Sequence, residues 1–137
     1  MRSVVVDANV FVSFFIERHE AQRAAARTLL LKAEDGEIAA VVPQSVVFEI
    51  AYVLQSQYGV SGERLAAVVR AVIAFSGVQI VDECPWKRVL EVWPDPLPSV
   101  ADAAIIAIAT TSRYDAVATF DRKLVNRLEA FGLAAYW

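Results

Sequence analysis

Cysteine and histidine are almost absent from this 137-residue sequence, and their scarcity excludes several kinds of site. One cysteine, Cys84, and one histidine, His19, cannot form an intrachain disulfide, a zinc finger or a metal site with several His or Cys ligands. A catalytic triad would have to use His19, which lies in a charged segment, and no GxSxG motif is present. We interpret His19 as an exposed residue at a helix start and Cys84 as a packed thiol.

Glycine is also scarce, and long hydrophobic runs are missing. The five glycines form neither a GxGxxG nor a GxxxxGK pattern, which excludes a dinucleotide site and a P-loop. No apolar run reaches the roughly 18–20 residues that span a bilayer. Asp7 and Asn9 interrupt the N-terminal apolar segment, which is unlike a signal peptide. We expect a cytoplasmic protein with no membrane partner.

Hydrophobic residues, in contrast, are abundant. They make up 57% of the chain and charged residues 21%, with a mean hydropathy of +0.44, so a disordered chain is excluded. The length predicts a single domain, 1–137. The apolar excess indicates either an unusually large buried fraction or an apolar surface that a partner covers. The net charge of −3 does not favour nucleic-acid binding through bulk positive charge.

Short apolar runs alternate with helical segments along the chain. We predict strands at 3–6, 38–42, 78–81, 116–119 and, at one edge, 133–136. We predict helices at 20–32, 44–57, 63–75, 86–93, 99–112 and 122–130, with one more helix starting after Asp7 or Asn9. The strands are continuous apolar runs without alternation, which is typical of a parallel sheet buried on both faces. The predicted fold class is therefore α/β.

Four acidic residues occupy the places where this fold class binds ligands. Asp7 ends the first strand, Asp121 follows the fourth, Asp102 lies in the first turn of one helix and Glu49 in the middle of another. Ligands of open parallel sheets bind outside the carboxyl ends of the strands. We therefore expect the four carboxylates to converge on one rim.

Each of these acids also has a structural interpretation. Asp7 and Asp121 can cap helices, Asp102 follows Ser99 at capping-box spacing, and Glu49 can belong to a solvated face. However, the helices of Glu49 and Asp102 are rich in Ala, Ile and Val, and neither acid has a Lys or Arg within a helical turn. Buried carboxylates need a partner or a metal. Clustered carboxylates suit Mg²⁺ or Mn²⁺, and phosphodiester hydrolysis is the chemistry that such a centre supports.

The acidic segments resemble, in order and spacing, the four motifs of PIN-domain ribonucleases. They are VVVDAN at 4–9, SVVFE at 45–49, DAAIIA at 102–107 and ATFD at 118–121. The compact chain is most similar to the VapC-type toxins of toxin–antitoxin modules. The resemblance implies a three-layer sandwich in which helices flank a central parallel sheet of four to five strands.

The resemblance also implies a function and its residues. Asp7, Glu49, Asp102 and Asp121 would bind Mg²⁺, or Mn²⁺, and carry out endoribonuclease catalysis through metal-activated water. Asn9 and Thr119 would orient these acids by hydrogen bonds. A small antitoxin protein would be the partner.

Basic residues near the proposed rim suggest how RNA would be held. We expect Arg18, Arg23 and Arg122 to contact the RNA backbone, although such charges can also form a solvated face. With the four proposed ligands set aside, 12 acidic residues face 13 basic ones, so the negative net charge does not oppose an RNA substrate.

The helix predicted at 63–75 is apolar almost all the way round from 65 onward. We predict that it forms, together with the helix at 44–57, a homodimer interface and a groove for a partner. The alternative is a fully buried core helix.

Two other functions compete with a ribonuclease. A non-catalytic α/β interaction module would use its acids only as helix caps and its apolar surface for a partner. A haloacid-dehalogenase-like phosphotransferase fits poorly, because Asn9 replaces the second acid of the DxD motif and no supporting lysine motif is evident.

Overall fold

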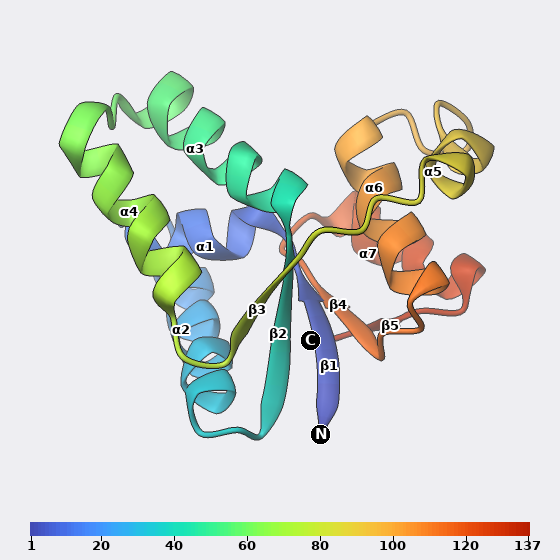
Figure 1. Ribbon diagram of the computed structural model, residues 1–137, viewed down its shortest axis with the longest axis horizontal. Helices are drawn as coiled ribbons and strands as arrows, with labels where there is room; N and C mark the ends of the chain where they lie inside the picture. The colour runs from blue at the N-terminus through green and yellow to red at the C-terminus, as the bar shows by residue number, and fades with distance from the viewer.

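The computed structural model describes all 137 residues, and its centre is a sheet of five parallel strands (Figure 1). The strands are β1 (Arg2–Val6), β2 (Ile38–Pro43), β3 (Val78–Val81), β4 (Ala116–Ala118) and β5 (Ala134–Ala135). Their order across the sheet is β3-β2-β1-β4-β5, and every neighbouring pair is parallel. In the central strand β1, Val4, Val5 and Val6 are fully buried, as expected for an apolar run covered on both faces.

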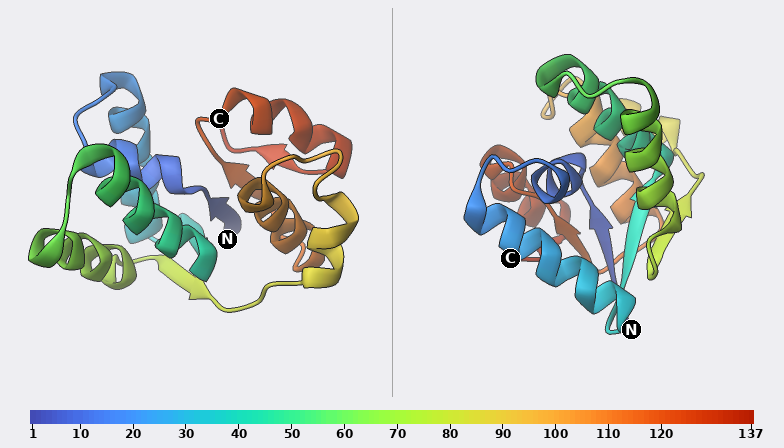
Figure 2. Two further views of the ribbon diagram at one scale, coloured as in Figure 1. Left: turned by 90° about the horizontal axis from the view of Figure 1, so that it is seen from above. Right: turned by 90° about the vertical axis from the view of Figure 1, so that its left-hand side faces the viewer.

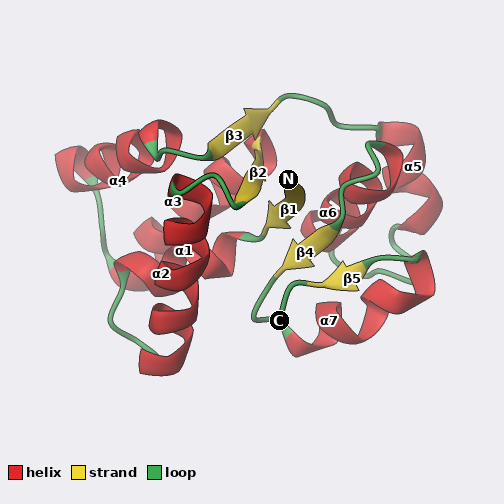
Figure 3. Cartoon of the chain, turned by 90° about the horizontal axis from the view of Figure 1, so that it is seen from below, coloured by secondary structure: helices red, strands yellow, loops and turns green.

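Helices cover both faces of the sheet, which confirms the predicted three-layer α/β fold. They are α1 (Ala8–Phe15), α2 (Glu20–Glu34), α3 (Gln44–Tyr58), α4 (Gly62–Ala74), α5 (Trp86–Val92), α6 (Val100–Thr111) and α7 (Arg122–Leu128). Figures 2 and 3 show α1 to α4 on one side of the strands and α5 to α7 on the other. Right-handed crossovers require this division, because the chain first adds β2 and β3 at one edge of β1 and then returns to the other. No helix is both long and apolar enough to span a bilayer.

Most predicted elements lie within one or two residues of the observed ones, and the larger differences are at the C-terminal end. The helix predicted at 122–130 ends at Leu128 and continues as a 3-10 turn, Glu129–Phe131, before Gly132. Gly132 has φ 73°, a left-handed conformation that stops a helix. The edge strand predicted at 133–136 is reduced to two residues, Ala134 and Ala135.

Two interpretations of single features need correction. Helix α4 is not a fully buried core helix, because only Val72 is buried and Ile73 is half exposed. Cys84 is not packed: it is exposed in the loop between β3 and α5, outside the apolar core. His19 is exposed and accepts a hydrogen bond from the backbone of Gln22 as the N-cap of α2, which confirms its predicted place.

Candidate functional site

The structure brings the four acidic residues together at the carboxyl ends of the central strands. Asp7 follows β1 and Asp121 follows β4, and these strands are direct neighbours in the sheet. Glu49 comes from α3 in one helical layer and Asp102 from α6 in the other, and Figure 1 shows these helices on either side of the strand ends. Electrostatic repulsion from at least one other acid of the four raises the pKa of Asp7, of Glu49 and of Asp102. The rim predicted from sequence is therefore formed by elements from all three layers.

Asp7 is the most constrained of the four. Only 7% of the residue is exposed, and its Oδ1 accepts the backbone N–H of Ala8 at 2.8 Å, which caps α1. Its Oδ2 accepts the hydroxyl of Thr119 at 2.7 Å and the side-chain amide of Asn9 at 3.2 Å. Helix capping and membership of the acidic cluster are thus both properties of this one carboxylate.

Thr119 and Asn9 join the end of β1 to the end of β4. The Thr119 hydroxyl donates to Asp7 and accepts both the Asn9 amide and the backbone N–H of Asp121, each at 3.1 Å. A hydroxyl has one donor and two acceptor positions, so all three are used. Asn9 Oδ1 in turn accepts the backbone N–H of Phe120 at 3.1 Å. The side chains of Asp7 and Asn9 and the segment around Asp121 are therefore held as one unit.

The other three acids are less enclosed. Asp121 caps α7, its Oδ1 accepting the backbone N–H groups of Lys123 at 2.9 Å and Leu124 at 3.4 Å. Glu49 is half-buried on α3, whose apolar residues Val46, Val47, Ile50 and Leu54 face the core. Asp102 is half-buried, and its backbone N–H donates to Ser99 Oγ, the cap of α6. Both of the latter carboxyl groups are thus free for a ligand.

Burial and electrostatic repulsion raise the pKa values of Asp7, Glu49 and Asp102. Burial, reinforced by the charges of Asp7 and Asp102, raises the pKa of Glu49 to about 7. Burial and the charges of Asp7 and Asp121 raise the pKa of Asp102 to about 6. Burial also raises the pKa of Asp7, against the lowering effect of its hydrogen bonds to Thr119 and Ala8. Near neutral pH the site therefore concentrates negative charge that a cation would stabilise.

Arg127 supplies the positive charge that sequence spacing did not predict for Asp102. It lies on α7, 25 positions further along the chain, and its charge partly offsets the raised pKa of Asp102. Its guanidinium also donates to the carbonyl of Pro96 in the loop before α6. Residue spacing within a helix predicts partners only on that same helix. The position of Arg127 near Asp102 depends instead on the packing of α7 beside the loop before α6.

The three arginines proposed to contact RNA have different surroundings. Arg18 donates to the hydroxyls of Ser13 and Tyr58 and to the carbonyl of Asn9, so it links α1 to α3. Arg23 forms an exposed ion pair with Glu17. Arg122 begins α7 and lines a cavity together with Thr119, next to the acids. An RNA contact stays a prediction for all three, and the geometry favours Arg122.

The donor chemistry of the cluster fits a hard divalent cation. All four side chains offer carboxylate oxygens, the ligands that Mg²⁺ and Mn²⁺ prefer. No group of three acidic, histidine or cysteine side chains is placed to hold a metal ion together. Mg²⁺ in proteins commonly takes one or two carboxylates and completes its shell with waters and substrate phosphates. Asp7 and Asp121, at the ends of adjacent strands, are the pair best placed for that arrangement.

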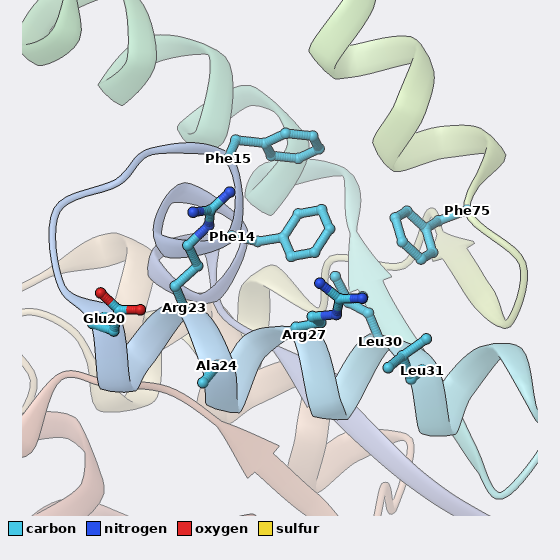
Figure 4. A pocket seen from close by; sticks show the side chains of 9 residues that line it. All are labelled: Phe14, Phe15, Glu20, Arg23, Ala24, Arg27, Leu30, Leu31 and Phe75. Atoms are coloured by element: carbon cyan, nitrogen blue, oxygen red, sulfur yellow. The ribbon is translucent and has the colours of Figure 1, made fainter.

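A separate, mainly apolar cavity of about 630 Å³ lies away from the acids, between α1, α2 and the end of α4. Figure 4 shows Phe14, Phe15 and Phe75 facing Arg23 and Arg27, which rise from α2. The predicted partner groove used the helices at 63–75 and 44–57. This cavity is a different one, since Phe75 is one wall and the other walls come from α1 and α2, and the groove on those two helices stays a prediction.

The raised pKa values predict how metal-free protein responds to pH. The pKa of Glu49 is 4.5 in the unfolded chain and about 7 in the folded one. Between these pH values the folded protein holds a proton that the unfolded chain has lost, so the contribution of Glu49 to the free energy of unfolding falls as pH rises. In EDTA, we expect Glu49→Gln to unfold at a higher temperature than the unmodified chain at pH 8 and at the same temperature near pH 4. Thermal unfolding followed by circular dichroism measures this difference.

Glu34→Gln, an exposed change on α2, is the matched control and should give no pH-dependent difference. A Glu49→Gln protein that is less stable than the unmodified chain at pH 8 would show that Glu49 is not under repulsion.

Solved structures share this architecture at low sequence identity. VapC20 of Mycobacterium tuberculosis, a sarcin–ricin loop cleaving toxin, matches with a TM-score of 0.72 over 96% of both chains at 16% identity. PAE2754 of Pyrobaculum aerophilum matches with a TM-score of 0.64 at 18% identity, covering 92% of this chain and 84% of its own. FitAcB of Neisseria gonorrhoeae matches with a TM-score of 0.63 at 16% identity, covering 98% and 96%.

Sequence comparison gives the family. Among curated proteins, none matches this sequence. The family model of the PIN domain matches residues 4–129, a range that includes all four acidic residues and the hydrogen-bonded junction between β1 and β4. Since the match spans most of the chain, this protein belongs to the PIN-domain family.

Proposed function

We propose that this chain is a Mg²⁺-dependent endoribonuclease, with Mn²⁺ as a possible substitute, and the toxin of a toxin–antitoxin pair in the cytoplasm. The observation that supports the proposal most directly is the meeting of Asp7, Glu49, Asp102 and Asp121 at one edge of the sheet. Membership of the PIN-domain family and the likeness of the fold to a toxin that cleaves the sarcin–ricin loop support it further.

The residues of the chain would divide the work as follows. Asp7 and Asp121 hold the cation, and Asn9 and Thr119 keep the Asp7 carboxylate in a fixed orientation through three hydrogen bonds. A divalent cation held there would lower the pKa of a water molecule and stabilise negative charge on the scissile phosphate.

Glu49 and Asp102 come from the two helical layers, and their carboxyl groups would bind the same cation, directly or through its waters. Arg122, next to the cluster, is placed to pair with a flanking phosphate. Single-stranded or looped RNA is the favoured substrate class, because its backbone can enter a narrow site.

Cleavage of RNA by purified protein tests this proposal against a non-catalytic interaction module. We expect cleavage of a single-stranded oligoribonucleotide with Mg²⁺ and none with EDTA. Asp7→Asn and Glu49→Gln should each reduce the rate by more than about 100-fold, since even residues that only support metal ligands contribute about 10- to 100-fold. Gel analysis of the products measures the rates.

Two comparisons make the outcome decisive. Glu49→Gln leaves the hydrogen bonds of Asp7 intact, so its loss of activity cannot come from a broken junction between the strands. Asp35→Asn, at the exposed end of α2, should retain full activity. Equal cleavage by the unmodified chain and both site variants would overturn the assignment.

The partner proposed for the apolar cavity is a small antitoxin that inserts apolar side chains of an amphipathic helix. Three phenylalanines offer the apolar contact, and Arg27 at the rim suits an acidic residue beside those side chains. Leu31, which is 45% exposed, lies at the mouth of this cavity.

Co-expression with any small protein that is encoded next to this chain's gene tests the partner site. We expect Leu31→Glu to weaken the complex by about tenfold or more, as loss of an interface anchor does, and to relieve inhibition of cleavage. Leu90→Glu, at another exposed leucine on α5, is the control and should bind as the unmodified chain does. Equal binding of both variants would place the partner elsewhere.

The homodimer proposed from sequence has support in exposed aromatic residues. Phe48 and Tyr52 are 74% and 70% exposed on α3, and Ile73 is half exposed on α4, which packs against α3. Such residues are enriched in interface cores.

Light scattering after size-exclusion chromatography tests this interface. We expect twice the chain mass of 15.0 kDa, and a single chain mass for Phe48→Glu. Trp86→Glu, on the exposed surface of α5, should leave the mass unchanged. A single chain mass for the unmodified protein at high concentration would refute the dimer.

A further inference from the structure

A second cavity, of about 560 Å³, adjoins the acidic cluster. It lies between the start of α2, the ends of β4 and β5 and the start of α7, and its volume is in the usual range for small-ligand sites. Thr119 lines it, and the hydroxyl of the same residue donates to Asp7 at 2.7 Å. The cavity and the proposed metal centre therefore share a wall.

Aromatic rings form one side of this cavity. The rings of Phe120 and Trp137 are stacked, with centroids 4.6 Å apart and planes 13° from parallel, and Tyr136 meets Trp137 edge-on at 5.3 Å. All three residues line the cavity, and Trp137 remains 48% exposed. A flat aromatic surface that is fixed by one stacked neighbour and open to solvent is suited to stacking with another planar ring.

Hydrogen-bond donors form the opposite side. His19 Nδ1 accepts the backbone N–H of Gln22 at 3.1 Å, which places the proton of the neutral ring on Nε2. Gln22 Oε1 accepts the hydroxyl of Ser13 at 3.0 Å, so the amide NH₂ of Gln22 is the end left to bind a ligand. Arg122 adds a guanidinium. The cavity thus offers donors to a ligand whose edge carries acceptors.

The position of this surface relative to the acids is fixed. The backbone N–H of Phe120 donates to Asn9 Oδ1, and the amide of Asn9 donates to Asp7. Phe120, whose ring is stacked on Trp137, is therefore hydrogen-bonded to Asn9, the side chain that orients the proposed metal ligand Asp7. A ligand in the cavity and a phosphate at the acids would therefore be held in fixed positions relative to each other.

We propose that this cavity binds a nucleobase of the RNA strand, stacked on Trp137, next to the nucleotide whose phosphate lies at the acidic cluster. A base provides both properties that the cavity matches: a planar ring and an edge with carbonyl and ring-nitrogen acceptors. The inference rests on the proposed ribonuclease function and names the part of the substrate that determines which sequences are cut.

Proton NMR of the single histidine tests binding without any cleavage. In EDTA, we expect the four nucleoside 5′-monophosphates to shift the His19 ring signals at millimolar concentration, with differences among the bases. Ribose 5-phosphate, which lacks the base, should not shift them. Trp137→Ala should abolish the shift, and Trp86→Ala, at another exposed tryptophan on α5, should retain it.

Cleavage kinetics give a second, independent measurement. Because Trp137→Ala removes the stacking of one base, we expect it to raise KM by about tenfold or more with little change in kcat. Trp137→Phe should restore most of the loss. Mapping of the cleaved ends should show that Trp137→Ala relaxes the base preference at one position beside the cut.

The outcomes separate this inference from the ribonuclease proposal. Cleavage that Trp137→Ala leaves unchanged, with no nucleotide-induced shift of His19, overturns the base pocket and leaves the nuclease intact. Nucleotide-induced shifts without any Mg²⁺-dependent cleavage support the pocket and refute the nuclease. Equal shifts from ribose 5-phosphate would overturn base recognition, as would nucleotide-induced shifts that Trp137→Ala leaves unchanged.

Discussion

The hydrogen bonds around the Thr119 hydroxyl are the interaction on which the rest of the site depends. One oxygen atom links Asp7 at the end of β1, Asn9 at the start of α1 and the backbone of Asp121 beyond β4. Without it, two neighbouring strands would end in a buried carboxylate with fewer partners, at a considerable desolvation cost. With it, a buried charge, a helix cap and the start of α7 form one rigid unit.

This unit explains why the acidic cluster can exist in a folded protein. Burial and mutual repulsion raise the pKa of Asp7, Glu49 and Asp102, which means that the charged cluster opposes folding at neutral pH. The large apolar core, which includes Val4 to Val6 and most of α6, supplies the compensating stability. The site is thus kept in a destabilised state, as is common where ligands bind, and a bound cation would relieve it.

The apolar excess of the composition also has a structural account. Much of it lies in the core of β1, β2, β4 and α6, but a substantial part is exposed. Phe48 and Tyr52 on α3 and Trp86 and Leu90 on α5 are exposed, and the phenylalanines of the cavity in Figure 4 are half-buried. The apolar excess is therefore only partly explained by the core.

The sequence by itself determined the local elements and the chemistry. Short apolar runs predicted the strands β1 and β4, and Asp7 and Asp121, which follow them, therefore had to lie at the carboxyl edge of a parallel sheet. Glu49 and Asp102 were predictable as acids in otherwise apolar helices. Only the tertiary structure decided which side chains meet across layers. The effect of the Arg127 charge on Asp102 and the hydrogen bond between Arg18 and Tyr58 both join segments far apart in the chain, and the half-exposed state of α4 likewise depends on packing. Periodicity reports which face of a helix is apolar and gives no information about what covers that face, since packing partners are set by topology.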